Sequence, residues 1–417
     1  MSGEVVLFLP CAAGVEDLLA NEVGGLDGVR ADAVQAQRGG VQVRGSWRTV
    51  LQLNLHSRLA QRVLLQLADA PYTKEDDVYA AAHAVPWEHW FGVRHTFRVD
   101  VTAQRSPLKS LNFAALRIKD AVADRFRAQA GSRPDVDTQR PDVRIHAHLG
   151  PDRITLSIDT SGEPLFKRGW REDKGDAPLK ETLAAAMLAA SGWQPGQDVP
   201  LYDPCCGSGT IVIEAAQMAC RIAPGSQRRF AFERLLPHQP ALWQELLAAA
   251  RDAEIRPPTI SIFGSDVSHR MADFAQRNAE RAGVAHAVQL RGGDALQRMP
   301  PTDHTGVLIL NPPYGERIET GGVARHKTPS RAPREHAIMD GAGAEEGDFF
   351  QRLGRHWKQH YGGWTAWVLS PDMQLPGRMR LQAARRVPMW NGPIECRLFR
   401  FDVLPAKTAV PLPEQTA

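Results

Sequence analysis

Apolar and polar positions along the chain alternate with the periods of strands and helices. Residues 5–10 (VVLFLP) form a short apolar run typical of a strand, and residues 14–23 (GVEDLLANEV) place apolar side chains at helical spacing. A second strand is predicted at residues 39–45 (GGVQVRG), which glycines bound on both sides. These elements predict a small α/β unit over residues 1–45.

A second α+β unit is predicted over residues 46–160. Its helices and strands differ in period, and its last two strands flank the turn Gly150-Pro151-Asp152. We predict helices at 47–61, 74–85 and 112–131, the last closed by Gly131, and strands at 62–68, 95–104, 143–149 and 153–159.

A third unit is predicted over residues 161–404. From residue 177 onward, helices and apolar strands alternate at the spacing of a parallel, doubly wound sheet, which indicates an α/β fold. Residues 319–348 are rich in glycine, alanine and charge but poor in large apolar side chains, so we expect a mobile insert there. Residues 405–417 show no periodicity and are expected to form a flexible tail.

Composition indicates a soluble, multidomain protein. The 417 residues, 43% hydrophobic and 23% charged, are enough for two or three cores, and no apolar stretch approaches the length of a membrane helix. The N-terminus is a poor signal peptide, so a cytoplasmic location is expected. Five cysteines without a C-x-x-C pair, and fourteen histidines without H-E-x-x-H spacing, predict reduced thiols and no metal site.

Charge is uneven along the chain although the net charge is only +3. Residues 94–133 hold nine Lys or Arg against three Asp. Such a basic segment can bind phosphates, but an ordinary solvated helix face has the same composition. The count alone leaves both interpretations open.

The segment 201–210 (LYDPCCGSGT) is the first candidate binding site. A strand that ends in Asp203, followed by a turn with Gly207 and Gly209 and then a helix, is typical of ligand binding at the carboxyl edge of a parallel sheet. A phosphate-binding loop would need a lysine, and a dinucleotide loop would need a glycine where Val212 stands. Asp203 instead favours a ligand with a cationic or donor-rich portion.

Two further acids, Asp266 and Asp294, follow the next predicted strands, and Ser268 is expected to cap the helix that follows the first of them. A carboxylate at the end of the second strand suits a ribose diol because it accepts both hydroxyl hydrogens. Each acid alone would more often be a helix cap or a turn residue. Three acids at successive strand ends indicate one site.

The apolar run 307–310 (VLIL) leads directly into Asn311-Pro312-Pro313-Tyr314. Proline removes a donor from a strand, so this tetrapeptide ends the strand, either in a simple turn or in a site. The preceding glycine loop and acids favour a site.

These motifs together resemble a known family. Residues 165–188 (LFKRGWREDKGDAPLKETLAAAML), 203–216, 264–284 and 311–318 (NPPYGERI) are similar, in this order, to the bacterial RlmL-like THUMP-domain RNA methyltransferases. Residues 53–67 and 106–122 resemble the THUMP region of that family. The resemblance implies a Rossmann-like class I methyltransferase domain with a mostly parallel seven-stranded sheet, preceded by ferredoxin-like and THUMP domains.

The resemblance also implies a cofactor, S-adenosylmethionine, and assigns residues to it. Gly207 and Gly209 would pass under its methionine part with Asp203 close by, Asp266 would bind the ribose, and Asp294 would face the adenine amino group. Cys206 and Ser208 complete the loop, and Thr182 would border the same pocket. The THUMP unit would bind RNA, for which the candidate residues are Arg105, Lys109, Arg117, Lys119, Arg125 and Arg127.

The implied chemistry suits the composition of the NPPY segment. An exocyclic amine is a poor nucleophile because its lone pair is delocalised into the base. The side-chain oxygen of Asn311 and the carbonyl of Pro312 can each accept one N–H and so orient the lone pair toward the methyl group. Pro313 restricts the carbonyl before it, and Tyr314 offers a ring for the base to stack on.

The implied reaction is methylation of a guanine N2 amine in RNA, with 23S rRNA favoured. A guanine in tRNA, an adenine amine in DNA, and a noncatalytic RNA-binding assembly factor with the same fold remain alternatives. Some members of the family carry a second methyltransferase unit that makes 7-methylguanosine. One unit is expected in these 417 residues, and therefore one methylation.

Overall fold

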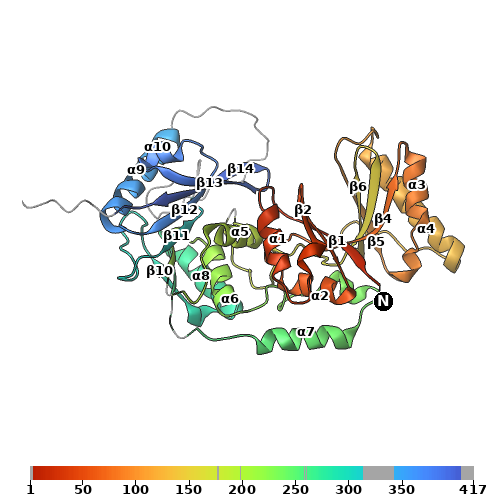
Figure 1. Cartoon of the computed structure of the whole chain (residues 1–417), viewed down its shortest axis with the longest axis horizontal. Coiled ribbons are helices and arrows are strands. Elements are labelled where there is room, and N and C mark those ends of the chain that lie inside the picture. Colours follow the sequence, from red (N-terminus) through yellow and green to blue (C-terminus); the bar gives the residue numbers. More distant parts are fainter. Residues whose placement is uncertain are drawn as a thin grey trace, which may run out of the picture. The chain divides into compact units, whose positions relative to one another are not determined.

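The computed structural model in Figure 1 describes residues 3–175, 178–197, 199–257, 259, 261–312 and 342–404. The chain forms two compact units. The first comprises Met1–Gly169 and Arg221–Glu254, and the second comprises Trp170–Cys220 and Ile255–Ala417.

One seven-stranded sheet runs through the first unit. Antiparallel pairing of Val6–Phe8 with Leu64–Gln66 joins the strands of the predicted N-terminal unit to those of the predicted THUMP unit, so these two units share a sheet. The strand order is β2 (Val34–Gln37), β3 (Gly40–Gly45), β1 (Val5–Pro10), β4 (Leu64–Pro71), β7 (Arg153–Asp159), β6 (Val143–Leu149) and β5 (Phe97–Ala103). The sequence predicted all of these strands except β2.

The described residues of the first unit contain five α-helices. They are α1 (Glu16–Gly24), α2 (Trp47–His56), α3 (Glu75–Ala84), α4 (Leu111–Ala130) and α7 (Pro240–Asp252). Gly131 ends α4 in the left-handed conformation, at φ 68°, as predicted. The predicted extension of α2 to residue 61 is wrong, because the Glu22 carboxylate accepts from the Ser57 hydroxyl (2.6 Å) and the Arg58 N–H (3.0 Å) and so binds the chain in an extended conformation.

Residues 221–254 group with the first unit, which differs from the predicted continuous third unit over 161–404. The Gly225 N–H donates to the Leu55 carbonyl (2.9 Å), and a Cβ at Gly225 would lie 2.7 Å from the Asn54 oxygen. The Arg228 guanidinium donates to the carbonyls of Pro164 (2.7 Å) and Ser161 (3.2 Å). These contacts join distant parts of the sequence, so no local pattern reveals them.

The second unit contains the predicted mostly parallel seven-stranded sheet. Its order is β10 (Val288–Gly292), β9 (Ile262–Asp266), β8 (Leu201–Asp203), β11 (Val307–Leu310), β12 (Thr365–Ser370), β14 (Ile394–Asp402) and β13 (Ala383–Asn391). The first five are parallel and β14 is antiparallel to both neighbours. The order reverses at β8, and such switch points are where open α/β sheets bind ligands.

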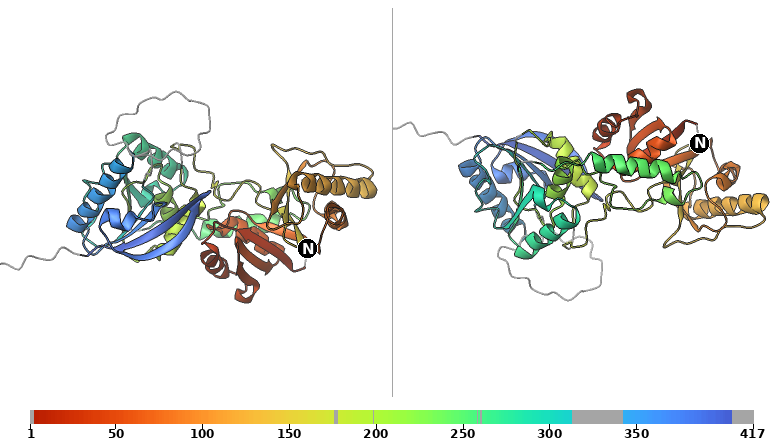
Figure 2. Two further views of the ribbon diagram at one scale, coloured as in Figure 1. Left: turned by 90° about the horizontal axis from the view of Figure 1, so that it is seen from above. Right: turned by 90° about the horizontal axis from the view of Figure 1, so that it is seen from below.

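Helices cover both faces of this sheet. Figures 1 and 2 show α5 (Glu181–Ser191), α6 (Thr210–Ala219) and α8 (His269–Arg281) on one face, and α9 (Ala342–His360) and α10 (Leu375–Met379) on the other. Helix α9 begins at Ala342, inside the predicted insert 319–348, and the mobile insert stays a prediction. Phe350, Leu353 and Trp357 repeat at helical spacing and are buried, which stabilises the helix. The rest of the insert and the predicted tail, 405–417, lie outside the described residues.

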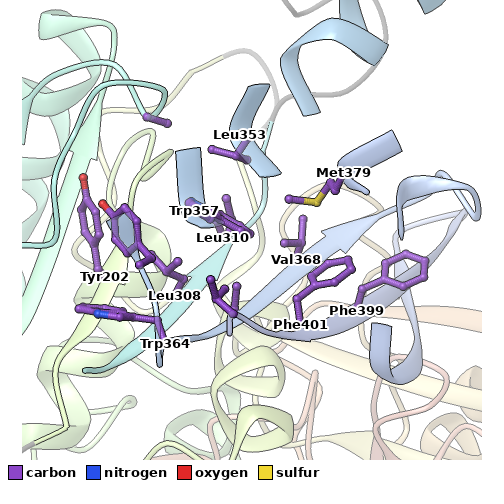
Figure 3. Packing of buried hydrophobic residues seen from close by; sticks show 14 of the residues in the cluster. Tyr202, Leu308, Leu310, Leu353, Trp357, Trp364, Val368, Met379, Phe399 and Phe401 are labelled. Atoms are coloured by element: carbon purple, nitrogen blue, oxygen red, sulfur yellow. The ribbon is translucent and has the colours of Figure 1, made fainter. Parts of the chain in front are cut away.

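A hydrophobic cluster fixes the strand that precedes Asn311. Figure 3 shows Leu308 and Leu310 of β11 packed with Trp357 of α9 and with Phe399 and Phe401 of β14, and all five are at most 1% exposed. Trp364 and Trp367 are also buried. The end of β11 is therefore attached to a rigid core.

The described part of the chain contains neither a membrane-spanning helix nor a cluster of metal-ligating side chains. None of its helices combines the length and apolarity needed to span a membrane. In the same residues, no three His, Cys, Asp or Glu side chains gather as metal ligands.

Candidate cofactor site

Four predicted site residues lie at one edge of the second sheet. Asp203 ends β8, Asp266 ends β9, Asp294 follows β10 by two residues, and Asn311 follows β11 directly. These four strands are parallel, and the register pairs Asp203 with Gly264 and Gly292 with Asp266. Because parallel strands end together, the structure brings the four polar side chains to the same carboxyl edge.

The glycine loop between β8 and α6 is tied to the neighbouring strand. The Cys206 N–H donates to the Ser265 carbonyl (2.9 Å), and the Gly209 N–H donates to the Cys206 carbonyl (2.8 Å). Gly207 and Gly209 have φ angles of 53° and 89°, which residues other than glycine rarely adopt. The turn therefore requires both glycines for backbone reasons.

The two glycines differ in what surrounds them. A Cβ at Gly209 would lie 3.0 Å from the Ala275 Cβ and 3.1 Å from the Ile213 Cδ1, so this glycine lets the loop pack on its own unit. A Cβ at Gly207 would meet no atom of the described residues within 4 Å. Gly207 is thus the point at which a ligand can approach the loop backbone.

Asp266 connects the loop to the end of β9. Its Oδ2 accepts from the Gly207 N–H (2.9 Å) and its Oδ1 from the Ser268 N–H (2.9 Å). Burial raises the pKa of Asp266, and the two N–H groups offset part of that effect. Ser268 is the N-cap of α8, as predicted, although its side chain makes no capping hydrogen bond.

Asp203 is the most deeply buried acid of the edge. It is 2% exposed and accepts from the Cys205 N–H (3.0 Å). Burial raises the pKa of Asp203 well above its usual value, and the negative charge of Asp266 raises it further. A ligand that brings positive charge or hydrogen-bond donors would stabilise the charged forms of these two buried carboxylates.

Asp294 lies in a loop that is joined to the same edge. Its Oδ1 accepts from the Leu296 N–H (2.9 Å), while the preceding Gly293 N–H donates to the carbonyl of Asp266 (2.9 Å). The Arg298 guanidinium closes the loop by donating to the Gly292 carbonyl (2.7 Å). The third acid is therefore held beside the second.

Asn311 presents a buried acceptor at the end of β11. Its Oδ1 is buried and has no hydrogen-bond partner among the described residues, and Pro312 beside it is also buried. A buried carbonyl oxygen without a partner costs free energy that a bound N–H group would recover. Pro313 and Tyr314, the other two predicted catalytic residues, lie outside the described residues.

Three other predicted cofactor residues are buried in the same unit. Thr182 lies in the first turn of α5. The Ser208 hydroxyl accepts from Arg171 (2.9 Å), so its oxygen already has a protein partner. Burial, followed by the charges of Asp203 and Asp266, raises the pKa of the Cys206 thiol well above its usual value, which argues against a thiolate there.

Sequence reasoning missed two residues that contact the glycine loop. Arg171 donates to the Ser208 and Thr210 hydroxyls, and the Asn278 Nδ2 donates to the Ser208 carbonyl (3.1 Å). Asn278 is fully buried on α8, whose other buried residues are alanines. A polar residue on the apolar stripe of a helix was the only available signal.

The six predicted RNA-binding residues divide into two groups. Four form ion pairs: Arg117 with Asp76 (2.8 Å), Lys119 with Asp120 (3.0 Å), Arg125 with Glu88 (2.5 Å) and Arg127 with Asp124 (2.8 Å). Arg105 and Lys109 precede α4, are exposed, and form no ion pair with the described residues. Of the six, these two carry a positive charge that no ion pair with a described residue compensates.

Three family profiles match the chain in the expected order. The RlmL ferredoxin-like domain matches residues 6–64, the THUMP domain matches 72–159, and the domain described as RMKL-like, methyltransferase domain, matches 168–344. The first match extends beyond residue 45, the predicted end of the N-terminal unit, as far as the start of β4.

A curated relative from Shewanella amazonensis, named ribosomal RNA large subunit methyltransferase K/L, is 38% identical over 413 residues. The match covers 98% of this chain and 54% of the relative. The chain spans about half the length of the curated relatives it matches. The expectation of a single methylation therefore stays a prediction.

Several solved structures match nearly the whole chain. One is the crystal structure of SMU.472 complexed with S-adenosyl-L-homocysteine (SAH), the product that S-adenosylmethionine leaves after methyl transfer. It has a TM-score of 0.82 at 26% identity and covers 98% of this chain and 100% of that one. A predicted N6-adenine-specific DNA methylase from Listeria monocytogenes has a TM-score of 0.81 at 27% identity, covering 96% of each chain. The predicted fold class is confirmed, and the chain carries an RlmL ferredoxin-like domain, a THUMP domain and an RMKL-like methyltransferase domain in that order.

Proposed function

We propose that this chain transfers a methyl group from S-adenosylmethionine to the exocyclic N2 amine of a guanine in RNA, with 23S rRNA as the favoured substrate. The observation that carries the proposal is the buried Oδ1 of Asn311, which has no hydrogen-bond partner among the described residues, at the edge that holds Asp203, Asp266 and Asp294. The named function of the curated relatives favours ribosomal RNA. A ribosomal substrate implies action in the cytoplasm.

The residues of the edge fit the cofactor. S-adenosylmethionine supplies an activated methyl group on a cationic sulfonium, together with a ribose diol and an adenine. Asp203 and Asp266 offer buried carboxylates to positive charge and hydroxyl donors, and Gly207 leaves open space for a ligand beside the loop. Asp294 and Thr182 are assigned to the adenine end and the border of the pocket, as the family resemblance implies.

Asn311 positions the nucleophile. Its Oδ1 accepts one N–H of the target amine, and the Pro312 carbonyl is assigned to the other. These bonds turn the nitrogen lone pair away from the acceptors and strengthen as positive charge develops on nitrogen, which stabilises the transition state. An amide suffices because the alkylated amine can release its proton to water.

The substrate assignment is tested by methyl transfer from radiolabelled S-adenosylmethionine to protein-free 23S rRNA, bulk tRNA and duplex DNA, all from cells that lack the protein. We expect label in 23S rRNA, recovered as N2-methylguanosine. Label in tRNA alone or in DNA adenine alone would replace the proposed substrate and keep the mechanism. Cofactor binding without label in any pool would favour a noncatalytic assembly role. The Asn311→Ala variant serves as the inactive control.

We assign the first contact with RNA phosphates to Arg105 and Lys109, because their charges are not compensated by ion pairs with described residues. The double variant Arg105→Ala, Lys109→Ala is expected to weaken RNA binding and to reduce the slope of log K against log salt by about 0.7 per lost phosphate contact. Filter binding over a salt series measures both quantities.

The matched control for this prediction is Arg125→Ala, Arg127→Ala on helix α4, which follows Arg105 and Lys109 in the chain. These arginines are paired with Glu88 and Asp124, so a smaller change in the salt slope is expected. Equal slopes for the two double variants would contradict the assignment.

A further inference from the structure

The segment that begins with Arg171 joins the glycine loop to the start of α5. The Arg171 guanidinium donates to the Glu181 carboxylate (2.7 Å), the Ser208 hydroxyl (2.9 Å), the Thr210 hydroxyl (2.7 Å) and the Leu179 carbonyl (3.3 Å). Its side chain is 12% exposed. One planar cation thus fixes the distance between α5 and the loop.

The two loop contacts enclose the most constrained point of the loop. Ser208 and Thr210 flank Gly209, which has φ 89° and packs tightly against Ala275. On the other side, Asn278 donates to the carbonyls of both Ser208 (3.1 Å) and Asp173 (2.8 Å). The loop is therefore held through side chains and backbone at once, while Gly207 stays open for a ligand.

Arg171 supplies positive charge beside a buried carboxylate as well as hydrogen bonds in a fixed geometry. Glu181 is 3% exposed, and burial raises the pKa of Glu181, an effect that the adjacent Arg171 partly reverses. A lysine would keep the charge, but its single ammonium cannot reproduce a fork that reaches one carboxylate and two hydroxyls. The substitution Arg171→Lys therefore keeps the positive charge and removes the geometry of the guanidinium.

We propose that Arg171 is a positioning residue, which holds the glycine loop in the conformation that admits S-adenosylmethionine and acts through Ser208 and Thr210. The proposal rests on the cofactor site and does not depend on which nucleic acid is methylated. Its effect falls on cofactor affinity, because the loop lies beside the cofactor and Asn311 belongs to a different strand.

The test compares Arg171→Lys with Arg277→Lys in the full chain. Arg277 donates to the Asp173 carboxylate of the same segment (3.1 and 2.8 Å), so it controls for loss of an arginine fork nearby. For Arg171→Lys we expect the Kd of SAH by calorimetry and the KM for S-adenosylmethionine to rise about tenfold or more, with kcat and the KM for RNA nearly unchanged. Arg277→Lys is expected to change none of the four.

Hydrogen exchange provides a readout that needs neither cofactor nor RNA. In the ligand-free protein, Arg171→Lys is expected to increase exchange in a peptide covering 203–215, while Arg277→Lys leaves it unchanged. If Arg171 were only a folding residue, the variant would lower Tm and the active fraction but leave both the KM and the SAH Kd unchanged. That outcome would overturn the proposal.

A second variant decides the case in which Arg171→Lys does not fold. Thr210→Val removes one acceptor on the loop and leaves the Arg171–Glu181 pair in place. Thr210→Val is expected to raise the Kd for SAH, as Arg171→Lys does. In the double variant, Thr210→Val is expected to raise the Kd by a smaller factor than it does alone, because both substitutions break the same contact. Wild-type SAH affinity in Thr210→Val would refute a role through the loop. Failure of the RNA assay alone would affect only the proposed substrate, because SAH binding and exchange are measured without RNA.

Discussion

Replacing Asn311 by alanine is expected to lower kcat about 10²- to 10³-fold, the usual effect of removing one transition-state hydrogen bond in a preorganised site. The Asn311 Oδ1 is buried at the end of β11 and has no partner among the described residues, so its bonding capacity is available to a substrate amine. The strand beneath it is packed through Leu308 and Leu310. The substitution therefore removes an acceptor without disturbing its support.

Affinity for SAH is expected to stay within about twofold of wild type in Asn311→Ala, since the three acids and the glycine loop are retained. A fall in kcat with an unchanged Kd separates a role in chemistry from a role in cofactor binding. Single-turnover methyl transfer and calorimetry measure the two quantities. Asn21→Ala, an exposed amide on α1, is the matched control.

The ligand-free stability of Asn311→Ala gives an independent check. A buried acceptor without a partner destabilises the folded state, so its removal is expected to leave Tm unchanged or slightly higher. A lower Tm together with lost activity would mean that Asn311 stabilises the fold, and it would contradict the assigned role.

The residues of the candidate site could be predicted from the sequence because each lies at the end of a short apolar strand. Asp203, Asp266 and Asn311 follow runs whose composition predicts buried parallel strands, and parallel strands carry their last residues to one edge. The order of the strands was not needed for this inference. Local patterns therefore sufficed to locate the site.

What the sequence did not reveal depends on contacts between distant segments. Arg171 precedes the loop it contacts by more than thirty positions, and its four acceptors carry no common pattern. The pairing of β1 with β4, which merges two predicted units into one sheet, and the packing of residues 221–254 with the first unit are contacts of the same kind. Periodicity reports the face that a segment buries, but it does not identify the partner.

Replacing Asp203 by asparagine is expected to weaken SAH binding and to stabilise the ligand-free protein. The variant keeps an oxygen for the Cys205 N–H but loses the charge offered to the ligand. A charge-assisted hydrogen bond contributes about 1.5 to 3 kcal/mol, which corresponds to a roughly 10- to 150-fold rise in Kd. Calorimetry with SAH measures this change.

The stability effect has a defined dependence on pH. Burial, and then the charge of Asp266, holds the pKa of Asp203 well above its usual value, so between the usual and the raised pKa the folded chain keeps a proton that the unfolded chain releases. Wild-type stability from this group is therefore present below about pH 4 and is lost as pH rises toward the raised pKa. The Tm advantage of Asp203→Asn should grow over that interval and then level off.

Thermal unfolding of the ligand-free proteins across that pH range, with Asp303→Asn as an exposed control, tests both signs together. A lower Tm for Asp203→Asn at neutral pH would show that the charged carboxylate stabilises the ligand-free protein. That result would contradict the proposed role of Asp203 in binding a cationic ligand. A higher Tm with weaker SAH binding would mean that this carboxylate destabilises the ligand-free fold and contributes to affinity when the cofactor binds. This pairing of lower stability with ligand affinity is expected of a buried binding site and not of a structural acid.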